Sequence, residues 1–229
     1  MNTPAEATLI VFVKAPRPGQ VKTRLARFLG EAAAGELYRC FVADLLAMLA
    51  GLALVPRVYF YPAEAGAVMR DWLGEEYSLF PQQGDSLGDK MSHALAETFQ
   101  AGADKAVLIG SDLPDLPPVI IKEALTALEQ SPAVIGPGID GGYYLIGFTA
   151  AGFTPAVFTD IPWSTETVFN RTMERFAAAG LRPYCLPAWA DIDTAADLRR
   201  FMADGRGNPG RAPRTMAWLR SASISEENL

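Results

Sequence analysis

The sequence predicts a Rossmann-like, three-layer α/β/α fold, in which a mixed, mostly parallel sheet lies between helices. Apolar runs of strand length alternate with longer segments of helical period, a pattern typical of crossover helices covering both faces of a sheet. Five or six such units follow one another, and half of the 229 residues are hydrophobic. A chain of this length can bury one large core, so we expect one domain over residues 1–203.

The strands are predicted from short apolar runs bounded by turn residues. Thr8 to Val13 is a continuous apolar run with β-branched residues, which indicates a first strand buried on both faces. Tyr143 to Phe148 follows a Gly-Gly pair too closely for a crossover helix, so we expect a hairpin and an antiparallel strand there. The other strands are expected at 57–61, 77–80, 105–109, 133–136 and 182–186.

Helices are predicted where apolar residues recur on one face. In the segment 31–49, Leu37, Phe41 and Leu45 form a stripe that can face the sheet. Further helices are expected at 64–73, 89–99, 119–129, 165–179 and 194–202, with Thr194 as a cap. From residue 204 onward Gly, Pro, Arg, Ser and Glu dominate, so residues 204–229 are predicted to be a poorly ordered tail with one short turn around 216–219.

The charge and cysteine content narrow the possible functions. The net charge of −6 argues against a general nucleic-acid binder, which needs an excess of Lys and Arg. The apolar stretch Leu9 to Val13 is too short for a membrane span and has no signal-peptide pattern around it. Cys40 and Cys185 match no metal or redox spacing. We therefore expect buried free thiols and a cytoplasmic protein.

A cationic segment follows the first strand. Between residues 14 and 27 there are five basic residues and no acid. Ligands of open α/β sheets bind at the carboxyl ends of strands, where guanidinium groups can hold phosphate oxygens and a glycine lets the backbone approach closely. A solvated basic turn is the alternative. The residues predicted to bind phosphate are Lys14, Arg17, Gly19, Lys22 and Arg24.

Acidic residues follow two other predicted strands. Asp112 lies in Gly110-Ser-Asp-Leu-Pro, directly after a strand, where a carboxylate can bind a divalent ion that bridges phosphates. Asp191 and Asp193 precede a late helix, and one of them could be the second ligand; we name Asp193. The alternatives are that Asp112 or Asp115 caps a turn and that Asp193 or Thr194 caps the helix.

Three glycines surround Asp140 in the segment 136–147. The carboxylate could accept hydrogen bonds from sugar hydroxyls, and Gly141 and Gly142 leave room for a ligand, although a plain hairpin turn also explains the glycines. Two further segments are weaker candidates: Gln83 and Gly88 for bonds to a base, and Trp163 and Ser164 for an acceptor pocket. A structural role is equally compatible with both.

These segments resemble, in this order, a bacterial family related to nucleotide-diphospho-sugar transferases that carries the domain of unknown function 2064 and includes arsenosugar-type glycosyltransferases. The resemblance runs from about Leu9 to Leu198. Its most specific element is Lys-Ala-Pro-x-Pro-Gly-x-Val-Lys-Thr-Arg-Leu at 14–25. Gly-Ser-Asp-x-Pro at 110–114 and Asp-Gly-Gly-Tyr-Tyr at 140–144 support it.

The resemblance implies a glycosyltransferase-A-like fold, a nucleotide-diphosphate donor above the first strand, and Mg²⁺ or Mn²⁺ near Asp112. Both sugar transfer and nucleotidyl transfer occur on this scaffold. Metal-dependent glycosyltransferases of the fold typically carry Asp-x-Asp, whereas here Leu113 and Pro114 follow Asp112. We expect a transferase that uses a nucleotide sugar and a small-molecule acceptor, with Asp112 and Asp140 as catalytic residues. Nucleotidyl transfer from a nucleoside triphosphate and nucleotide binding without catalysis are the alternatives; base, sugar, acceptor and oligomeric state stay open.

Overall fold

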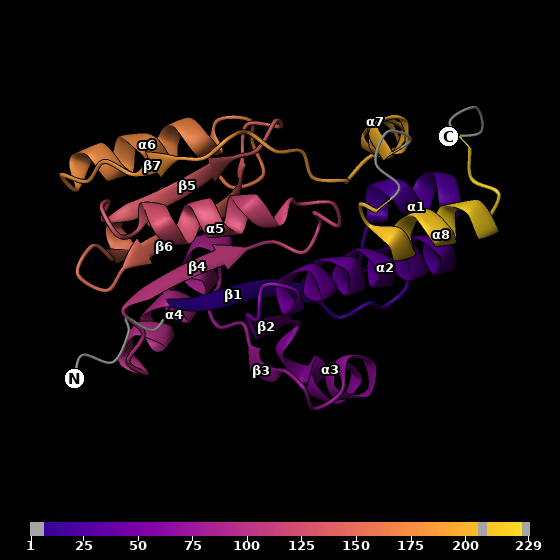
Figure 1. Ribbon diagram of the computed structural model, residues 1–229, viewed down its shortest axis with the longest axis horizontal. Helices are drawn as coiled ribbons and strands as arrows, with labels where there is room; N and C mark the ends of the chain where they lie inside the picture. Colours follow the sequence, from indigo (N-terminus) through magenta and orange to yellow (C-terminus); the bar gives the residue numbers. More distant parts are fainter. Residues whose placement is uncertain (1–6, 206–209, 226–229) are drawn as a thin grey trace.

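The computed structural model describes residues 7–205 and 210–225, which form a seven-stranded sheet between helices (Figure 1). The strands lie in the order β3-β2-β1-β4-β6-β5-β7. β6 runs antiparallel to both of its neighbours, and the other pairs are parallel. The predicted hairpin and mixed sheet are therefore confirmed. The strands are β1 Ala7–Lys14, β2 Arg57–Tyr61, β3 Ser78–Pro81, β4 Lys105–Ile109, β5 Ala133–Pro137, β6 Tyr143–Thr149 and β7 Tyr184–Cys185.

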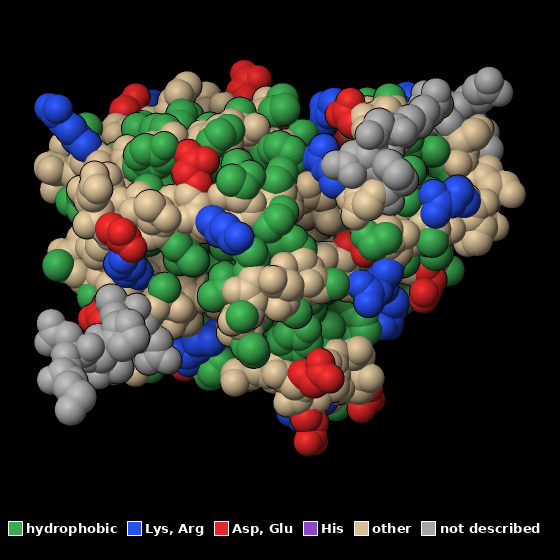
Figure 2. All heavy atoms as spheres, in the orientation of Figure 1, with side chains coloured by type: hydrophobic (Ala, Val, Ile, Leu, Met, Phe, Trp, Pro, Cys, Tyr) green, Lys and Arg blue, Asp and Glu red, His purple; other side chains and the backbone are tan. Residues whose placement is uncertain are grey.

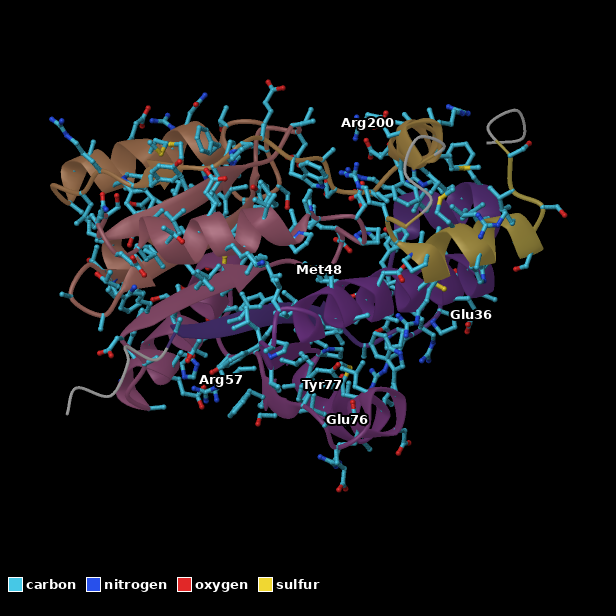
Figure 3. All side chains as sticks on the ribbon, in the orientation of Figure 1. Glu36, Met48, Arg57, Glu76, Tyr77 and Arg200 are labelled. Carbon is cyan, nitrogen blue, oxygen red and sulfur yellow. The ribbon has the colours of Figure 1, made fainter. Side chains whose placement is uncertain are left out.

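Helices cover both faces of this sheet. They are α1 Thr23–Leu29, α2 Glu31–Ala50, α3 Gly66–Leu73, α4 Leu87–Gln100, α5 Pro118–Ala127, α6 Val168–Ala178, α7 Ala195–Gly205 and α8 Pro213–Ser221, with short 3-10 segments at Ala63–Ala65 and Pro155–Phe158. On α2, Glu36 near the start is exposed, whereas Met48 near the end packs against the core (Figure 3). None of the described helices is long and apolar enough to cross a membrane.

The core consists of two apolar layers, one on each face of the sheet. Along β1, Leu9 and Val11 belong to the layer that includes α2 and α5, whereas Ile10 and Phe12 belong to the layer that includes α4 and α6. Successive side chains of a strand point to opposite faces, so a strand covered on both sides is apolar at every position. This explains the continuous apolar run of β1.

Two regions differ from the predictions. Residues 23–29, for which no helix was predicted, form the helix α1. The helix begins directly after Lys22, whose backbone has a left-handed conformation (φ 49°). The described part of the predicted poorly ordered tail contains α8, a nine-residue helix. The buried carboxylate of Asp44 on α2 accepts hydrogen bonds from the backbone amides of Arg214 and Thr215, at 3.0 and 2.8 Å, and so caps α8. Residues 206–209 and 226–229 of that tail lie outside the described residues.

The distribution of surface charge (Figure 2) agrees with the expectation from the sequence, whereas the burial of the two cysteines agrees only in part. On the face shown in Figure 2, acidic and basic side chains are scattered among each other, with no single large basic patch. Cys40 and Cys185 are free, as predicted. However, Cys40 is only partly buried and Cys185 is exposed on β7, so the expectation of buried thiols is wrong for Cys185.

Candidate functional site

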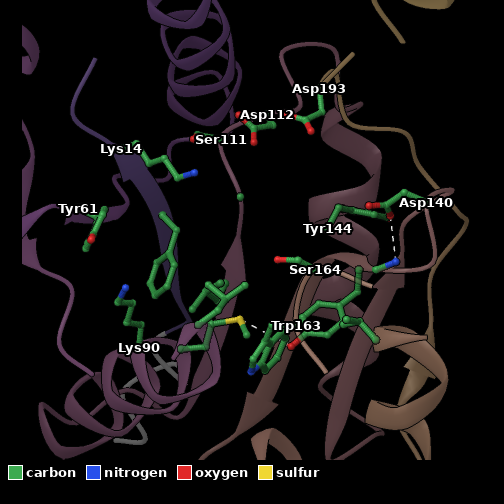
Figure 4. A pocket seen from close by; sticks show the side chains of 18 of the residues that line it. Lys14, Tyr61, Lys90, Ser111, Asp112, Asp140, Tyr144, Trp163, Ser164 and Asp193 are labelled. Carbon is green, nitrogen blue, oxygen red and sulfur yellow. Dashed lines mark hydrogen bonds between the residues drawn. The ribbon is translucent and has the colours of Figure 1, made fainter. Parts of the chain in front are cut away.

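A cavity of about 740 Å³ opens at the carboxyl ends of β1 and β4 (Figure 4). The chain leaves β1 toward β2 on one side, while β4 lies on the other side of β1, so the cavity lies where the strand order reverses. Such a switch point is where open α/β sheets bind ligands. The cavity is lined by Lys14 at the end of β1, by Ser111 and Asp112 after β4, and by residues from α4, β6 and the segment 163–168.

One side of the cavity carries three acids, Asp112, Asp140 and Asp193, which we call the acidic wall (Figure 4). Two of them share the ammonium group of Lys22. Lys22 Nζ lies 2.8 Å from Asp112 Oδ1 and 3.7 Å from Asp193 Oδ1. The structure thus brings together the cationic segment after β1 and the acid after β4, as the sequence suggested. The two segments meet in a direct ion pair between Lys22 and Asp112, whereas the sequence predicted a phosphate between them.

Asp193 reaches the cavity because a different residue caps α7. Thr194 Oγ1 accepts a hydrogen bond from the amide of Asp197, and Asp197 Oδ2 accepts one from the amide of Thr194. This reciprocal arrangement satisfies the start of the helix. The Asp193 carboxylate is therefore free to pair with Arg24 Nη1, at 2.9 Å, as well as with Lys22. The capping role predicted as an alternative belongs to Thr194.

Asp191 lies on the other side of the same segment, where it lines a second cavity of about 200 Å³. Burial raises the pKa of the Asp191 carboxyl to about 6, against the lowering effect of Lys22, and the neighbouring charges of Asp140, Asp112 and Asp193 raise it further. Of the two acids that the sequence left open, only Asp193 faces the cavity that contains Asp112. The three neighbouring carboxylates thus disfavour the ionised form of Asp191.

The opposite side of the cavity is basic. Lys14 and Lys90 line it together with Tyr61, and we call these three residues the basic wall (Figure 4). Lys90 Nζ lies 4.2 Å from the centroid of the Tyr61 ring, a cation–π distance. Within the described chain, neither lysine pairs with an acid. Sequence reasoning missed Lys90; its only signal is its position in the first turn of α4, one turn after the Ser86 cap.

Tyr38 and Ser111, two buried residues that were not among the predicted site residues, support the floor of the cavity. The hydroxyl of Tyr38, on α2, accepts a hydrogen bond from the backbone amide of Lys14 at 2.8 Å and lies 2.8 Å from Ser111 Oγ. Burial raises the pKa of Tyr38 above its ordinary range, and the charge of Asp112 adds to this effect. A neutral phenol therefore ties the end of β1 to the loop after β4. Ser111 was visible in the Gly-Ser-Asp motif, but Tyr38 gave no signal apart from helical spacing.

The glycine-rich turn has the structural role that the sequence left open, and it also lines the cavity. Asp140 Oδ1 accepts a hydrogen bond from the amide of Gly142 at 2.9 Å, which stabilises the turn, and both residues line the cavity. Gly141 instead packs the turn against the next loop: its φ is +89°, and an added Cβ would collide with the carbonyl oxygen of Glu166. Gly141 therefore has a structural role, and Asp140 keeps one carboxylate oxygen without a hydrogen bond in the described chain.

Only some residues of the two weaker candidate segments line the cavity. Trp163 and Ser164 line the cavity, as does Gln82, whereas Gln83 is exposed outside it. Gly88 is buried under the indole of Trp163, where an added Cβ would lie 2.8 Å from Cζ2. The glycine therefore allows α4 to approach Trp163 closely.

Only some residues of the cationic segment line the cavity. Lys14 and Arg24 line the cavity, but Arg17 is turned toward Glu64, with 3.4 Å between Arg17 Nη1 and Glu64 Oε1. Gly19 has a positive φ of 75° and lies against the carboxylate of Glu31, outside the cavity. The Lys22 side chain is 3% exposed and lies behind the acids. The structure thus gives Arg17, Gly19 and Lys22 places that differ from the predicted direct phosphate contacts.

The donor set suits a hard divalent ion. Asp112 and Asp193 offer carboxylate oxygens, the ligands that Mg²⁺ prefers, and their side chains are 41% and 36% exposed. Among the described residues, no group of three or more His, Cys, Asp or Glu side chains could hold a metal ion. An ion at this site would therefore need phosphate and water oxygens to complete its coordination, as Mg²⁺ sites with one or two carboxylates do.

Comparison with known proteins gives the relatives of this chain. The family described as "Uncharacterized protein conserved in bacteria (DUF2064)" matches residues 45–165. A crystal structure of a protein from Desulfovibrio desulfuricans G20, provisionally named a nucleotide-diphospho-sugar transferase, is 39% identical over 96% of each chain, with a TM-score of 0.90. None of the curated proteins matches the chain significantly.

More distant solved structures share the fold alone. CMP:2-keto-3-deoxy-manno-octonic acid synthetase complexed with CTP is 12% identical, with a TM-score of 0.54 over 88% of this chain and 99% of that chain. The inositol-1-phosphate CTP transferase from T. maritima is 16% identical, with a TM-score of 0.54 over 94% and 98%. The predicted fold is thereby confirmed, and the predicted assignment to the transferase class agrees with the relative that is 39% identical. By its family match and its 39% identity to a solved relative over nearly all of its length, this chain belongs to the bacterial DUF2064 family of nucleotide-diphospho-sugar transferase-like proteins.

Proposed function

We propose that this chain is a cytoplasmic transferase that moves a glycosyl group from a nucleotide sugar to a small-molecule acceptor, with Mg²⁺ or Mn²⁺. The observation that supports the proposal most is that a basic wall and an acidic wall face each other across one cavity at the switch point of the sheet (Figure 4). A diphosphate bridged to an ion needs both kinds of charge on opposite sides. The relative provisionally named a nucleotide-diphospho-sugar transferase supports the same choice.

The cations of the cavity would hold the diphosphate. The ammonium groups of Lys14 and Lys90 are without acidic partners in the described chain, and Arg24 lines the cavity with a 66% exposed side chain. Charge-assisted bonds from such groups to phosphate oxygens are stronger than bonds between neutral groups. They would bind the donor and stabilise the charge that develops on the leaving nucleoside diphosphate.

Two other cavity residues would orient the reacting groups. The oxygen of Asp140 that has no hydrogen bond could accept one from a hydroxyl of the donor sugar or of the acceptor. Trp163 and Ser164 line the neighbouring part of the cavity, where the indole offers an apolar surface to a sugar or acceptor. These residues would align the two substrates and limit the access of water.

Asp112 and Asp193 would hold the metal ion. When bound, the ion would neutralise charge on the leaving diphosphate. Because Asp112 Oδ1 and Asp193 Oδ1 both face Lys22, the ion would share these carboxylates with the ammonium group. The same pair would serve a triphosphate equally well.

Nucleotidyl transfer is the second candidate. The observation that favours it is the pairing of one acid after β4 with another late in the chain, because Asp112 and Asp193 meet at Lys22. Two carboxylates held together in this way could bind an ion that bridges the oxygens of a triphosphate. The reaction would release pyrophosphate from a nucleoside triphosphate, whereas glycosyl transfer would release a nucleoside diphosphate from a nucleotide sugar.

A thermal-shift screen followed by product analysis tests the proposal. Nucleotide sugars and nucleoside triphosphates would be compared with and without Mg²⁺ or Mn²⁺, because a ligand that binds only the folded state raises the melting temperature. We expect a nucleotide sugar with the metal to give the largest shift and a nucleoside diphosphate to be released. Pyrophosphate release would favour the second candidate, and binding without turnover of either donor would indicate a nucleotide-binding protein.

A further inference from the structure

Lys22 places a buried ammonium group at the two acids that we assign to the metal ion. Its Nζ lies 2.8 Å from Asp112 Oδ1 and 3.7 Å from Asp193 Oδ1, and it donates a hydrogen bond to the backbone carbonyl oxygen of Ile192. The side chain is 3% exposed. Few buried lysines are unpaired, because a desolvated charge needs partners, and this one has three oxygen partners.

The backbone and the packing hold Lys22 in this position. The residue has a left-handed conformation with φ 49° and immediately precedes α1. Its ammonium group also lies 5.6 Å from the centroid of the Phe41 ring on α2. The side chain thus lies between α2 and the segment that carries Ile192, and an exposed position would lose these contacts. The ammonium group is therefore a fixed part of the acidic wall.

The four groups that form ion pairs here balance one another without a metal ion. Asp112 and Asp193 carry two negative charges, and Lys22 and Arg24, which pair with them, carry two positive charges. A divalent ion that arrived alone would add two positive charges beside an ammonium group. Charges only a few ångströms apart in a partly buried site repel strongly. A diphosphate that arrived with the ion would bring the missing negative charge.

We propose that Lys22 keeps the pair Asp112–Asp193 from binding a free divalent ion, so that the ion enters only together with a polyphosphate. This inference rests on the proposed function, since it concerns the same metal and phosphate site. Lys22 is then a positioning residue: it holds both carboxylates in place and couples the binding of metal to the binding of nucleotide. By linkage, each ligand strengthens the binding of the other by the same factor.

Calorimetric titration of the full chain tests this coupling. Wild-type protein and the Lys22→Met variant would be titrated with Mn²⁺ alone and with a preformed complex of Mn²⁺ and inorganic pyrophosphate. The matched control is Arg27→Met, which removes the same charge from α1 at an exposed residue for which the described chain shows no ion pair. Circular dichroism and thermal melting would establish that each variant is folded.

We expect the wild type and Arg27→Met to bind the complex at least about tenfold more tightly than Mn²⁺ alone, a typical coupling between two ligands. In Lys22→Met, Mn²⁺ alone should bind about tenfold more tightly than in the wild type, because the competing ammonium group is gone. A residue that merely stabilised the fold would not tighten metal binding when removed.

Two results would overturn the inference. If Mn²⁺ alone bound equally to the wild type and to Lys22→Met, Lys22 would not control access, and the proposed function would stand. If Lys22→Met did not fold, Lys22→Gln would be titrated in its place, and unchanged binding of Mn²⁺ alone in that variant would contradict the inference. Failure of both ligands to bind any of the proteins would contradict the coupling and the metal-dependent part of the proposed function together.

Discussion

The two walls of the cavity differ in how their charges are compensated. On the acidic wall, Asp112 and Asp193 are held by Lys22 and Arg24 before any ligand arrives. On the basic wall, Lys14 and Lys90 have no acidic partner in the described chain, and Lys90 only lies over the Tyr61 ring. The acidic wall is thus preorganised by the protein, while the basic wall needs an anion to complete it. This difference suggests that the anionic ligand approaches the basic wall first.

The largest effect is expected from the acidic wall. Asp112→Asn should abolish metal-dependent binding of nucleoside diphosphates and lower turnover by about 100-fold or more, as removal of one preorganised electrostatic group does. The asparagine side chain keeps the size of Asp112 and one oxygen that can accept a hydrogen bond from Lys22, so the variant should fold, with some loss of stability from the weakened contact to the buried ammonium group. Calorimetry with a panel of nucleoside diphosphates, with and without Mg²⁺, measures the effect. An unchanged affinity in the presence of Mg²⁺ would refute the metal assignment.

The basic wall should give the next largest effect. Lys14→Ala and Lys90→Ala should each weaken a nucleoside diphosphate by about tenfold, the value of a hydrogen bond to a charged group, and should leave the affinity for a nucleoside nearly unchanged. Arg17→Ala is the matched control, because Arg17 pairs with Glu64 outside the cavity. Equal weakening of diphosphate and nucleoside would show that these lysines do not contact phosphates.

A smaller effect is expected where the cavity is shaped by packing. Gly88→Ala would place a Cβ 2.8 Å from the Trp163 indole and 2.9 Å from the carbonyl oxygen of Phe158, so both must shift, at a cost of about 1–3 kcal/mol as in other overpacked sites. Binding of the donor and acceptor should weaken several-fold, and the melting temperature should fall. Gly35→Ala is the control: it lies in α2 with nothing within 4 Å, so the variant should be at least as stable as the wild type. If both variants had the same melting temperature and the same affinity for the substrates, the position of Trp163 would not depend on Gly88.

The smallest effect on binding is expected far from both walls. Asp44→Ala removes the carboxylate that caps α8, and the loss of such a cap costs about 0.5–2 kcal/mol of stability. Urea denaturation should show this loss, while nucleotide affinity should stay at the wild-type value. A marked loss of nucleotide affinity in this variant would mean that the C-terminal helix influences the cavity.

Local patterns in the sequence predicted most of the fold, because the strands are apolar runs and most helices have a clear periodicity. The exceptions are elements that depend on distant partners. The first amides of α8 bond to Asp44, which lies 170 residues before Arg214 in the sequence. No local signal shows such a cap. α1 begins after a lysine with positive φ, whose side chain is held by Asp112 and Ile192.

The same distinction applies to the site. Residues in short motifs at strand ends, such as Lys14, Asp112 and Asp140, were predicted and do line one cavity. Residues that reach the cavity from helices, such as Tyr38 and Lys90, were missed because only the tertiary arrangement places them there. The sequence also could not show that Lys22 pairs with acids, since the sign of a charge reveals neither its depth nor its partner.

The central claim is that both walls act on a single polyphosphate. Crystals grown with Mn²⁺ and a nucleoside diphosphate test it most directly, through the anomalous scattering of manganese. We expect one manganese peak within coordination distance of Asp112 and Asp193, with the diphosphate extending from it to Lys14 and Lys90. A diphosphate bound outside this cavity, or manganese bound away from both acids, would contradict the account.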